Sequence, residues 1–359
     1  MATEIVPLAP ELLPAVRRFG ERVWRRPRSD AFYRWRYTDS ASFHVGRLAM
    51  RDGECLAMEC AIRRPWRVDG ERVDVLEVFD WYCLPELRNA GLGVRVMQAL
   101  MQEPHPLMLV GGSEDTQGLL PRLRWQVVGE AERWVLPLGV GRLADALGQR
   151  LPLGPRLARL AARVALARPG SRPRRRRVPA GGRALAVSRV GEEALALYHR
   201  PSPYRTVPTW TPELLGWLLG GFAALGHFVP LYYACGDRLV GWALLRVLPT
   251  LHGCDAELIE CFAPEPEANL YTWMVSEAAV VAAGFRPGVI GAQTTCPLLA
   301  EALRRNSFVR SATNLVQLWW PGRNSLPGPM AIASNTGDGP LVPWATTWWD
   351  ASQRPTGSQ

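Results

Sequence analysis

A six-residue loop, Arg88-Asn89-Ala90-Gly91-Leu92-Gly93, is the part of the sequence best suited to bind a ligand. An apolar strand pattern precedes the loop, and an amphipathic helix pattern follows it. A loop in this setting presents successive backbone N–H groups at the start of a helix, where they can bind phosphate. Gly91 and Gly93 have no Cβ atom, so a pyrophosphate can approach the backbone closely. The pattern therefore predicts a phosphate-binding loop.

Two common nucleotide-binding loops do not fit this segment. A dinucleotide fingerprint needs a third glycine where this chain has Val96. A P-loop needs Gly-Lys followed by serine or threonine, and the chain contains no lysine. The loop is therefore expected to bind a phosphate group of another kind of ligand.

The elements that position this loop read as a mixed α/β domain over residues 1–140. Two helical patterns lie near the N-terminus, and a hairpin turns at Asp52-Gly53. A second turn at Asp69-Gly70 leads into a long strand that ends before Pro85. The loop and its helix follow, and another buried strand is expected at 107–112.

The rest of the chain divides into three parts. Residues 141–183 form a basic linker that is partly helical and partly extended or disordered. Residues 184–322 repeat the element order of the first region, and residues 323–359 form a tail rich in Pro, Gly, Ser and Thr. We therefore expect an α/β (α+β) fold of two tandem domains, each with a mixed central sheet flanked by helices.

The strand, the loop at 88–93 and the helix together resemble motif A of the GNAT superfamily of acyl-CoA-dependent N-acyltransferases. The pattern of that motif is Gln/Arg-x-x-Gly-x-Gly/Ala, and Pro85 lies three residues upstream of it here. The resemblance covers residues 1–140 and implies a GNAT-like fold. Residues 184–322 look like a degenerate second copy, because the corresponding run Pro264–Leu270 has no glycine and has two carboxylates. That copy is not expected to bind CoA.

The resemblance also implies which residues bind the co-substrate, which would be acetyl-CoA or another acyl-CoA, without a metal. The backbone of the loop would bind the pyrophosphate, and main-chain groups near Trp81 and Cys83 would pair with pantetheine. Ser113 stands where many members have an asparagine. The residues implied to bind acyl-CoA are Trp81, Cys83, Arg88, Asn89, Ala90, Gly91, Leu92, Gly93 and Ser113.

The family reaction needs a base for the attacking amine and an acid for the leaving thiolate. Glu77 occupies a position that holds the base in some members; the alternative is a glutamate on the solvent face. Strand alternation turns Asp80 to the face opposite Glu77. Leu120 stands where the family often has its tyrosine acid, so Tyr82 is either a substitute proton donor or a buried packing residue. Cys83 has no histidine nearby and reads as a core cysteine.

The net charge of +9 is concentrated in the linker. Residues 142–183 contain 12 arginines and one acid, a net charge of +11, so the rest of the chain carries 9 − 11 = −2. Arg156, Arg159 and Arg163 run beside a stripe of Leu157, Leu160 and Val164. The stripe either packs on a domain or, over residues 156–177, contacts an anionic membrane surface. The run Arg174–Arg177 has no interleaved aromatic residues, so specific nucleic-acid binding is not expected.

Composition also indicates the cellular compartment of the protein. The seven cysteines include no CxxC pair, and the chain has neither a signal-peptide pattern nor an apolar run long enough for a membrane span. A cytoplasmic protein is therefore expected. The predicted activity is transfer of an acetyl or other short acyl group from CoA to a primary amine of a small molecule or sugar. The alternative is a non-catalytic acyl-CoA-binding scaffold or sensor, held at a membrane through the linker helix.

Overall fold

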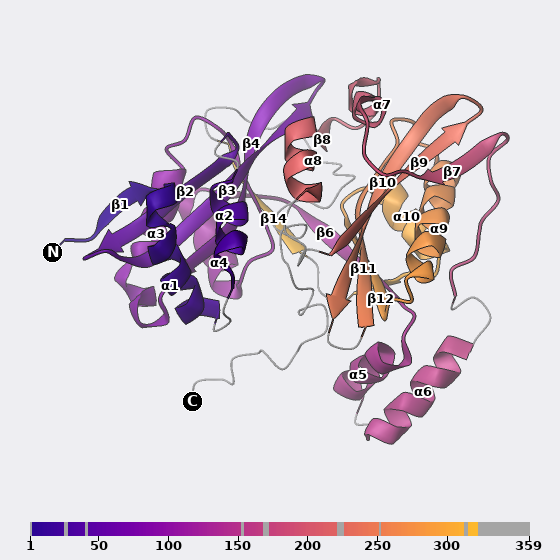
Figure 1. Ribbon diagram of the computed structural model, residues 1–359, viewed down its shortest axis with the longest axis horizontal. Helices are drawn as coiled ribbons and strands as arrows, with labels where there is room; N and C mark the ends of the chain where they lie inside the picture. The colour runs from indigo at the N-terminus through magenta and orange to yellow at the C-terminus, as the bar shows by residue number, and fades with distance from the viewer. Residues whose placement is uncertain are drawn as a thin grey trace.

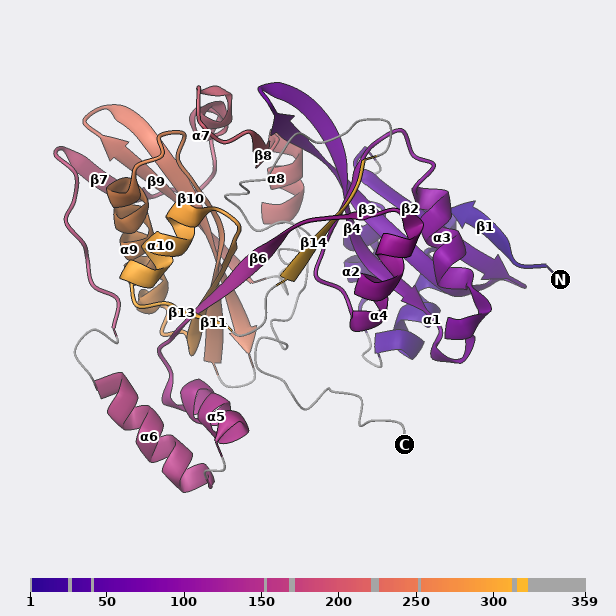
Figure 2. The same cartoon turned by 180° about the vertical axis from the view of Figure 1, so that it is seen from behind.

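The computed structural model describes residues 2–24, 28–39, 42–151, 154–167, 172–220, 226–250, 253–311 and 315–321. The N-terminal and C-terminal halves of the chain lie side by side and share one mixed sheet of fourteen strands (Figure 1). Helices flank the sheet in both halves (Figures 1 and 2). The expected mixed α/β class is therefore confirmed, while the predicted tail at 323–359 lies outside the described residues.

The N-terminal half contains the two helical patterns, the hairpins and the long strand that the sequence predicts. Its strands are β1 (Glu4–Pro7), β2 (His44–Arg51), β3 (Glu54–Val68), β4 (Glu71–Cys83), β5 (Leu107–Val110) and β6 (Gln126–Pro137). Its helices are α1 (Leu13–Trp24), α2 (Asp30–Tyr37), α3 (Leu92–Leu100) and α4 (Glu114–Leu119), with 3₁₀ helices η1 (Pro10–Leu12), η2 (Pro85–Ala90) and η3 (Leu120–Leu123).

The C-terminal half follows a helical hairpin made of α5 (Val140–Arg150) and α6 (Pro155–Ala167). Its strands are β7 (Gly182–Ala186), β8 (Thr206–Pro208), β9 (His227–Cys235), β10 (Arg238–Thr250), β11 (Gly253–Phe262), β12 (Val289–Thr294), β13 (Val309–Arg310) and β14 (Leu315–Trp320). Its helices are α7 (Glu192–Leu195), η4 (Ala196–His199), α8 (Pro212–Leu219), α9 (Ala268–Gly284) and α10 (Pro297–Arg305).

The strand path reads the same from both ends of the sheet. Its order is β1-β2-β3-β4-β5-β14-β6-β12-β11-β10-β9-β7. From either end, antiparallel neighbours lead to one parallel pair, which is β4 with β5 in one half and β11 with β12 in the other. An antiparallel strand then follows in each case.

The last strand of each half lies in the sheet of the other half. β6 pairs with β12, from Pro137 opposite Val289 to Glu132 opposite Thr294. β14 pairs with β5, and it also pairs with β6 along the line where the halves meet. Backbone hydrogen bonds therefore join the halves, and neither residues 1–140 nor residues 184–322 contain all the strands of their part of the sheet.

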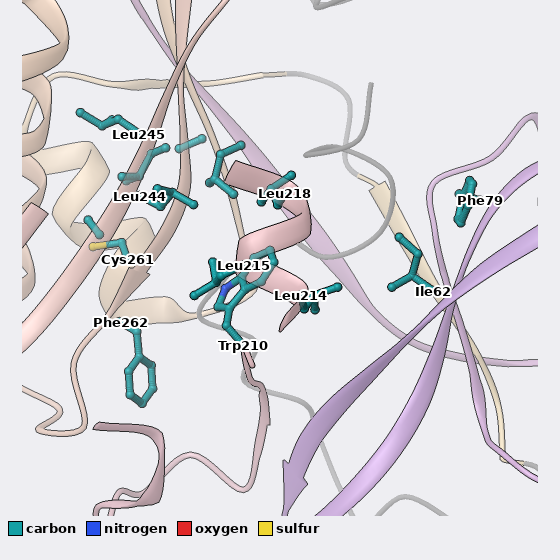
Figure 3. Close-up of a cluster of buried hydrophobic side chains, with 14 of the residues drawn as sticks. Ile62, Phe79, Trp210, Leu214, Leu215, Leu218, Leu244, Leu245, Cys261 and Phe262 are labelled. Atoms are coloured by element: carbon teal, nitrogen blue, oxygen red, sulfur yellow. The ribbon is translucent and has the colours of Figure 1, made fainter. Parts of the chain in front are cut away.

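Helix α8 fills the space between the two parts of the sheet (Figure 3). Thr211 caps its N-terminus by accepting a hydrogen bond from the Leu214 N–H at 3.2 Å, and Pro212 follows in the first turn. The helix buries Leu214, Leu215 and Leu218. Each buried leucine contributes about 1.5–3 kcal/mol by leaving water. The helix therefore joins both halves into one core.

The apolar partners of α8 come from both halves. Figure 3 shows its leucines between strands that carry Leu244 and Leu245 and strands that carry Ile62 and Phe79. On its outer side Trp217 stacks on Trp35 of α2, with ring centroids 4.7 Å apart and planes 6° apart. Each of these two indoles donates a hydrogen bond to the other residue's carbonyl, at 3.2 and 2.9 Å.

The linker is largely ordered by contacts in the described part of the chain. Helices α5 and α6 pack on each other through Ala144, Ala158 and Ala162, and the pair projects from the sheet (Figures 1 and 2). Further on, the backbone N–H of Arg176 donates to Ser276 of α9 at 3.3 Å, and Arg175 pairs with Glu277 at 3.5 Å. Among the helices that the structure describes, none is both long and apolar enough to cross a membrane.

Candidate active site

The predicted phosphate loop forms a compact turn at the N-terminus of α3. Residues 85–90 are the 3₁₀ helix η2, and Gly91 follows with φ +72°, a left-handed conformation that favours glycine. The first hydrogen bond of α3 runs from the Arg95 N–H to the Gly91 carbonyl at 3.1 Å. The N–H groups of residues 92–94 therefore precede the helical ladder and lie at the positive end of the helix dipole.

Space and charge at this turn suit an anion. Gly91 is exposed, and a Cβ atom added there would meet no described atom within 4 Å. Arg88, Asn89 and Ala90 are exposed as well, and Arg88 brings a positive charge to the segment that leads into the helix. The predicted loop thus has free approach, backbone donors and positive charge in one place.

Strand β4 carries a bulge just before the turn. Its pairing with β3 shifts register between Met58 and Cys60, and Asp80 has φ +53°. The Asp80 carboxylate accepts hydrogen bonds from Arg36 at 2.6 Å and from Tyr37 at 2.7 Å, both on α2. The prediction that Asp80 turns away from the Glu77 face is wrong, because the bulge breaks the alternation of side chains.

Just before the bulge, β4 and β5 separate. The two parallel strands pair only at Leu76 opposite Leu107 and at Glu77 opposite Met108. The rest of β4, Val78–Cys83, then continues toward the turn at Gly91 without β5 as a partner among the described residues. A gap of this kind leaves main-chain donors and acceptors available to an extended ligand.

The side chains after the bulge point to two sides of the sheet. The indole N–H of Trp81 donates to the Gly93 carbonyl at 2.9 Å, and the Cβ of Cys83 lies 4.0 Å from where a Cβ on Gly93 would be. Burial raises the pKa of the Cys83 thiol, which fits a packing cysteine rather than a thiolate nucleophile. Tyr82 instead packs edge-on against Trp24 of α1, with ring centroids 5.5 Å apart. Its side chain is 40% exposed, so the buried alternative for Tyr82 is wrong.

Ser113 and Leu120 lie beyond the end of β5. Ser113 is exposed and caps α4 by accepting a hydrogen bond from the Thr116 N–H at 3.2 Å. Leu120 is fully buried and packs in one apolar cluster with Trp125. The position of the usual family tyrosine therefore belongs to the core.

Glu77 lies inside the molecule, on the face of β4 opposite α3. It is 6% exposed, so the solvent-face alternative is wrong. Its Oε1 accepts a hydrogen bond from the Trp66 indole at 3.0 Å and lies 3.5 Å from the Arg64 guanidinium. The carboxylate is thus held by two side chains of β3, the neighbouring strand.

Arg64 connects this carboxylate to the C-terminal half. It is 2% exposed, and its guanidinium lies 4.1 Å from the ring centroid of Trp210. Its Nε donates to the Thr209 carbonyl at 2.9 Å, and Glu260 of β11 lies 3.9 Å from it. Glu77, Arg64 and Glu260 therefore form a buried row of charges that crosses from one half to the other.

Glu260 is fully enclosed by donors. Its Oε2 accepts hydrogen bonds from Tyr198 at 3.1 Å and Trp210 at 2.9 Å, and its Oε1 accepts one from the Cys261 N–H at 2.9 Å. Burial raises the pKa of Glu260 to about 7, although Arg64 and the hydrogen bonds oppose the shift. Sequence reasoning missed this residue; the available signal was a carboxylate inside the apolar run of β11.

Gln317 of β14 is a second missed residue. It is 1% exposed and pairs with Val110 at the end of β5, two residues along the strands from the row of Glu77, Met108 and Trp319. Among the described residues, neither polar atom of its amide has a hydrogen-bond partner. Because β4 and β5 separate at this level, β14 brings a buried, unsatisfied amide to the edge of the gap between these two strands.

The helix that corresponds to α3 in the C-terminal half has the opposite character. The loop before α9 carries Glu265 and Glu267, and Glu265 pairs with Arg238 at 3.2 Å. Carboxylates at a helix N-terminus repel a phosphate. Among the residues that the structure describes, no cluster of three His, Cys, Asp or Glu side chains could hold a metal ion.

Known structures share this fold at low sequence identity. A probable N-acyltransferase from Enterococcus faecalis is 11% identical, with a TM-score of 0.58 over 89% of this chain and 72% of that one. Saccharomyces cerevisiae N-myristoyltransferase, solved with bound myristoyl-CoA, is 14% identical, with a TM-score of 0.62 over 92% of this chain and 85% of that one. A GCN5-related N-acetyltransferase from Anabaena variabilis is 12% identical, with a TM-score of 0.58 over 89% and 72%.

No curated protein matches the chain by sequence. A family model does match: that of the acetyltransferase (GNAT) family, over residues 9–104. The matched segment includes the bulge of β4, Glu77 and the turn at Gly91. Residues 9–104 therefore resemble the acetyltransferase (GNAT) family in sequence, and the whole chain shares the fold of these N-acyltransferase structures.

Proposed function

We propose that this protein transfers an acetyl or other short acyl group from acyl-CoA to a primary amine of a small molecule or sugar. The observation that carries the proposal is the exposed, left-handed turn at Gly91, which joins the bulged end of β4 to the N-terminus of α3. A pyrophosphate fits the free N–H groups there. An extended pantetheine fits the edge of β4 from which β5 diverges after Glu77.

The residues present fit acyl-CoA as a co-substrate. Arg88–Gly93 bind the pyrophosphate, and the main chain near Trp81 and Cys83 pairs with pantetheine. The thioester then lies near the place where β4 and β5 separate, with Glu77 on one face of β4. Ser113 is assigned a weaker role at the edge of this site, because its hydroxyl already caps α4.

Acyl transfer requires that the amine reach the thioester carbonyl in its neutral form. Glu77 accepts the proton of the incoming ammonium, directly or through a water molecule. The amine nitrogen bonds to the acyl carbon, and the bond from that carbon to sulfur breaks. Tyr82, which is partly exposed, gives its hydroxyl proton to the departing thiolate and takes up the second proton that the attacking nitrogen loses as the amide forms.

The acceptor enters between the two halves. Glu77 faces this boundary, and Arg64, Glu260 and Trp210 line the continuation of the same buried row. We propose that the C-terminal half is a degenerate second copy whose role is to shape this acceptor site. The symmetric strand path and the carboxylates before α9 support that assignment.

The test is calorimetric titration with acetyl-CoA of the wild type and two glycine variants. Gly91→Glu should abolish micromolar binding, because it brings a carboxylate and a side chain to the phosphate position. Gly53→Glu is the matched control: Gly53 also has a positive φ, +76°, and no described atom within 4 Å of an added Cβ. It bears the same backbone strain far from the loop and should keep wild-type affinity. Unchanged affinity in a folded Gly91→Glu variant would overturn the assignment.

A second candidate is a non-catalytic acyl-CoA sensor. The buried Leu120 favours it, because the usual family proton donor is replaced by a core residue. The two functions differ in turnover: an acyltransferase releases free CoA thiol when acetyl-CoA is mixed with a panel of primary amines, and a sensor binds acetyl-CoA without releasing thiol.

A further inference from the structure

We propose that α6 is an interfacial helix that docks the protein on an anionic lipid surface. The helix has two different faces. Its inner face, with Ala158 and Ala162, packs on α5. Its outer face exposes three large apolar side chains: Leu157 is 59% exposed, Leu160 56% and Val164 55%.

The outer face combines the two kinds of side chain that bind lipid. At 3.6 residues per turn, the three apolar side chains occupy one sector of about 60°. An adjacent sector holds Arg156, Arg159 and Arg163, all exposed. Apolar side chains of such a helix enter the acyl boundary of a bilayer, and arginines beside them reach lipid phosphates.

The position and charge of α6 agree with this role. The α5–α6 pair projects from the sheet, and α6 lies on the side of the pair away from the sheet in the described part of the chain (Figures 1 and 2). The sequence of α6 contains no acidic residue. In the basic run that follows, Arg175 and Arg176 are engaged by α9 and by the C-terminal end of α10.

Other occupants fit this face less well. Phosphates of a nucleic acid would use the arginines but give no reason for three exposed aliphatic side chains. A second copy of the chain docking α6 on α6 would bring arginines against arginines with no acid between them. An anionic bilayer contacts both the exposed apolar side chains and the adjacent arginines of α6.

The experiment is flotation of the full chain with vesicles of phosphatidylcholine alone, or with about one lipid in three replaced by phosphatidylglycerol. The wild type should float only with anionic vesicles and less at high salt. Arg156→Gln/Arg159→Gln/Arg163→Gln should weaken binding about 100-fold, at about fivefold for each arginine. Leu157→Ser/Leu160→Ser/Val164→Ser should weaken it at least about tenfold without changing the charge.

Matched controls place the same changes elsewhere. Arg51→Gln/Arg122→Gln/Arg189→Gln removes three exposed arginines, and Val127→Ser/Leu185→Ser/Val309→Ser replaces three exposed apolar residues. Both should bind vesicles like the wild type. Circular dichroism and acetyl-CoA titration verify that the α6 variants are folded. Absence of wild-type flotation, or flotation retained by both α6 variants, would overturn the proposal. The proposal would also be overturned if the wild type formed a dimer and bound no vesicles, and if that dimer dissociated only in the Leu157→Ser/Leu160→Ser/Val164→Ser variant.

Discussion

The indole N–H of Trp81 donates a hydrogen bond to the carbonyl oxygen of Gly93 across 2.9 Å. This contact ties the end of β4 to the first turn of α3. A ligand that uses both the β4 main chain and the N–H groups of α3 needs a fixed spacing between them. The Trp81 bond sets that spacing with one side chain.

Trp81→Phe should therefore weaken acetyl-CoA binding while leaving the fold intact. An aromatic ring is retained, although a smaller one, and one hydrogen bond is lost, which costs about 1 kcal/mol, or roughly fivefold in affinity. Titration calorimetry measures the change. Trp134→Phe is the control, because the Trp134 indole also donates one hydrogen bond, to Glu132 at 3.0 Å on β6. Equal affinities for the two variants would show that the contact does not position the ligand.

Glu77→Gln should lower kcat by about 10²–10⁴-fold with little change in acetyl-CoA affinity. Glutamine keeps an oxygen that accepts from Trp66 but cannot take a proton from the amine. Glu132→Gln is the matched control, because Glu132 likewise accepts from an indole and pairs with an arginine, Arg310, at 3.1 Å. Thiol release gives kcat, and calorimetry gives the affinity. If kcat, affinity and melting temperature all fell together in Glu77→Gln, the residue would be structural rather than catalytic.

Local patterns predict most of what surrounds the loop. The turn at Gly91, the following helix and the strand before it follow from residue spacing within about twenty positions, which is the range over which helix and strand periodicity act. The burial of Glu77 could not be decided in this way. Its apolar neighbours fit both a buried strand and a strand with one solvated face.

Two features of the site lie beyond local patterns. The bulge at Asp80 breaks the alternation of side chains along β4, and it depends on pairing with β3 and on hydrogen bonds from α2. The insertion of β14 beside β5 joins residues about 200 positions apart, so no local period signals it. Gln317 therefore reaches the candidate site through tertiary pairing alone.

Glu260 should make stability depend on pH in the neutral range. Its pKa is about 7 in the folded protein and near the ordinary 4.5 in the unfolded chain. The folded state then holds an extra proton between these values, so this contribution to stability is present below pH 4.5 and is lost as the pH rises toward 7. The full change is on the order of 3 kcal/mol.

The measurement is urea unfolding of the wild type and of Glu260→Gln from pH 5 to pH 8. The wild type should lose stability relative to the variant as the pH rises, because glutamine does not titrate. Glu301→Gln is the control: the pKa of Glu301 is about 2, lowered by hydrogen bonds from Arg304 and Arg305. It is ionised in both states over this range, so its difference from the wild type should stay constant. A constant difference for Glu260→Gln would contradict the raised pKa.

Because β6 and β14 each pair in the sheet of the other half, we expect the two halves to stay together after the chain is cut. A protease site inserted between residues 167 and 172 divides the protein after α6, before β7 begins. The backbone hydrogen bonds of β6 with β12 and of β14 with β5 and β6 should hold the two fragments in one complex. The fragments should co-elute in size exclusion and unfold in a single transition.

A protein cut at a different site is the control for the cut at 167–172. A site in the turn at Gly53 divides β2 from β3 within the N-terminal half and leaves the exchanged strands in place. Both cut proteins should elute at the size of the uncut chain. Separate elution of two folded fragments after the cut at 167–172 would mean that each half completes its own sheet. In that case β6 and β14 would have to return to the halves that encode them, and Gln317 would leave the edge of the gap beside β5.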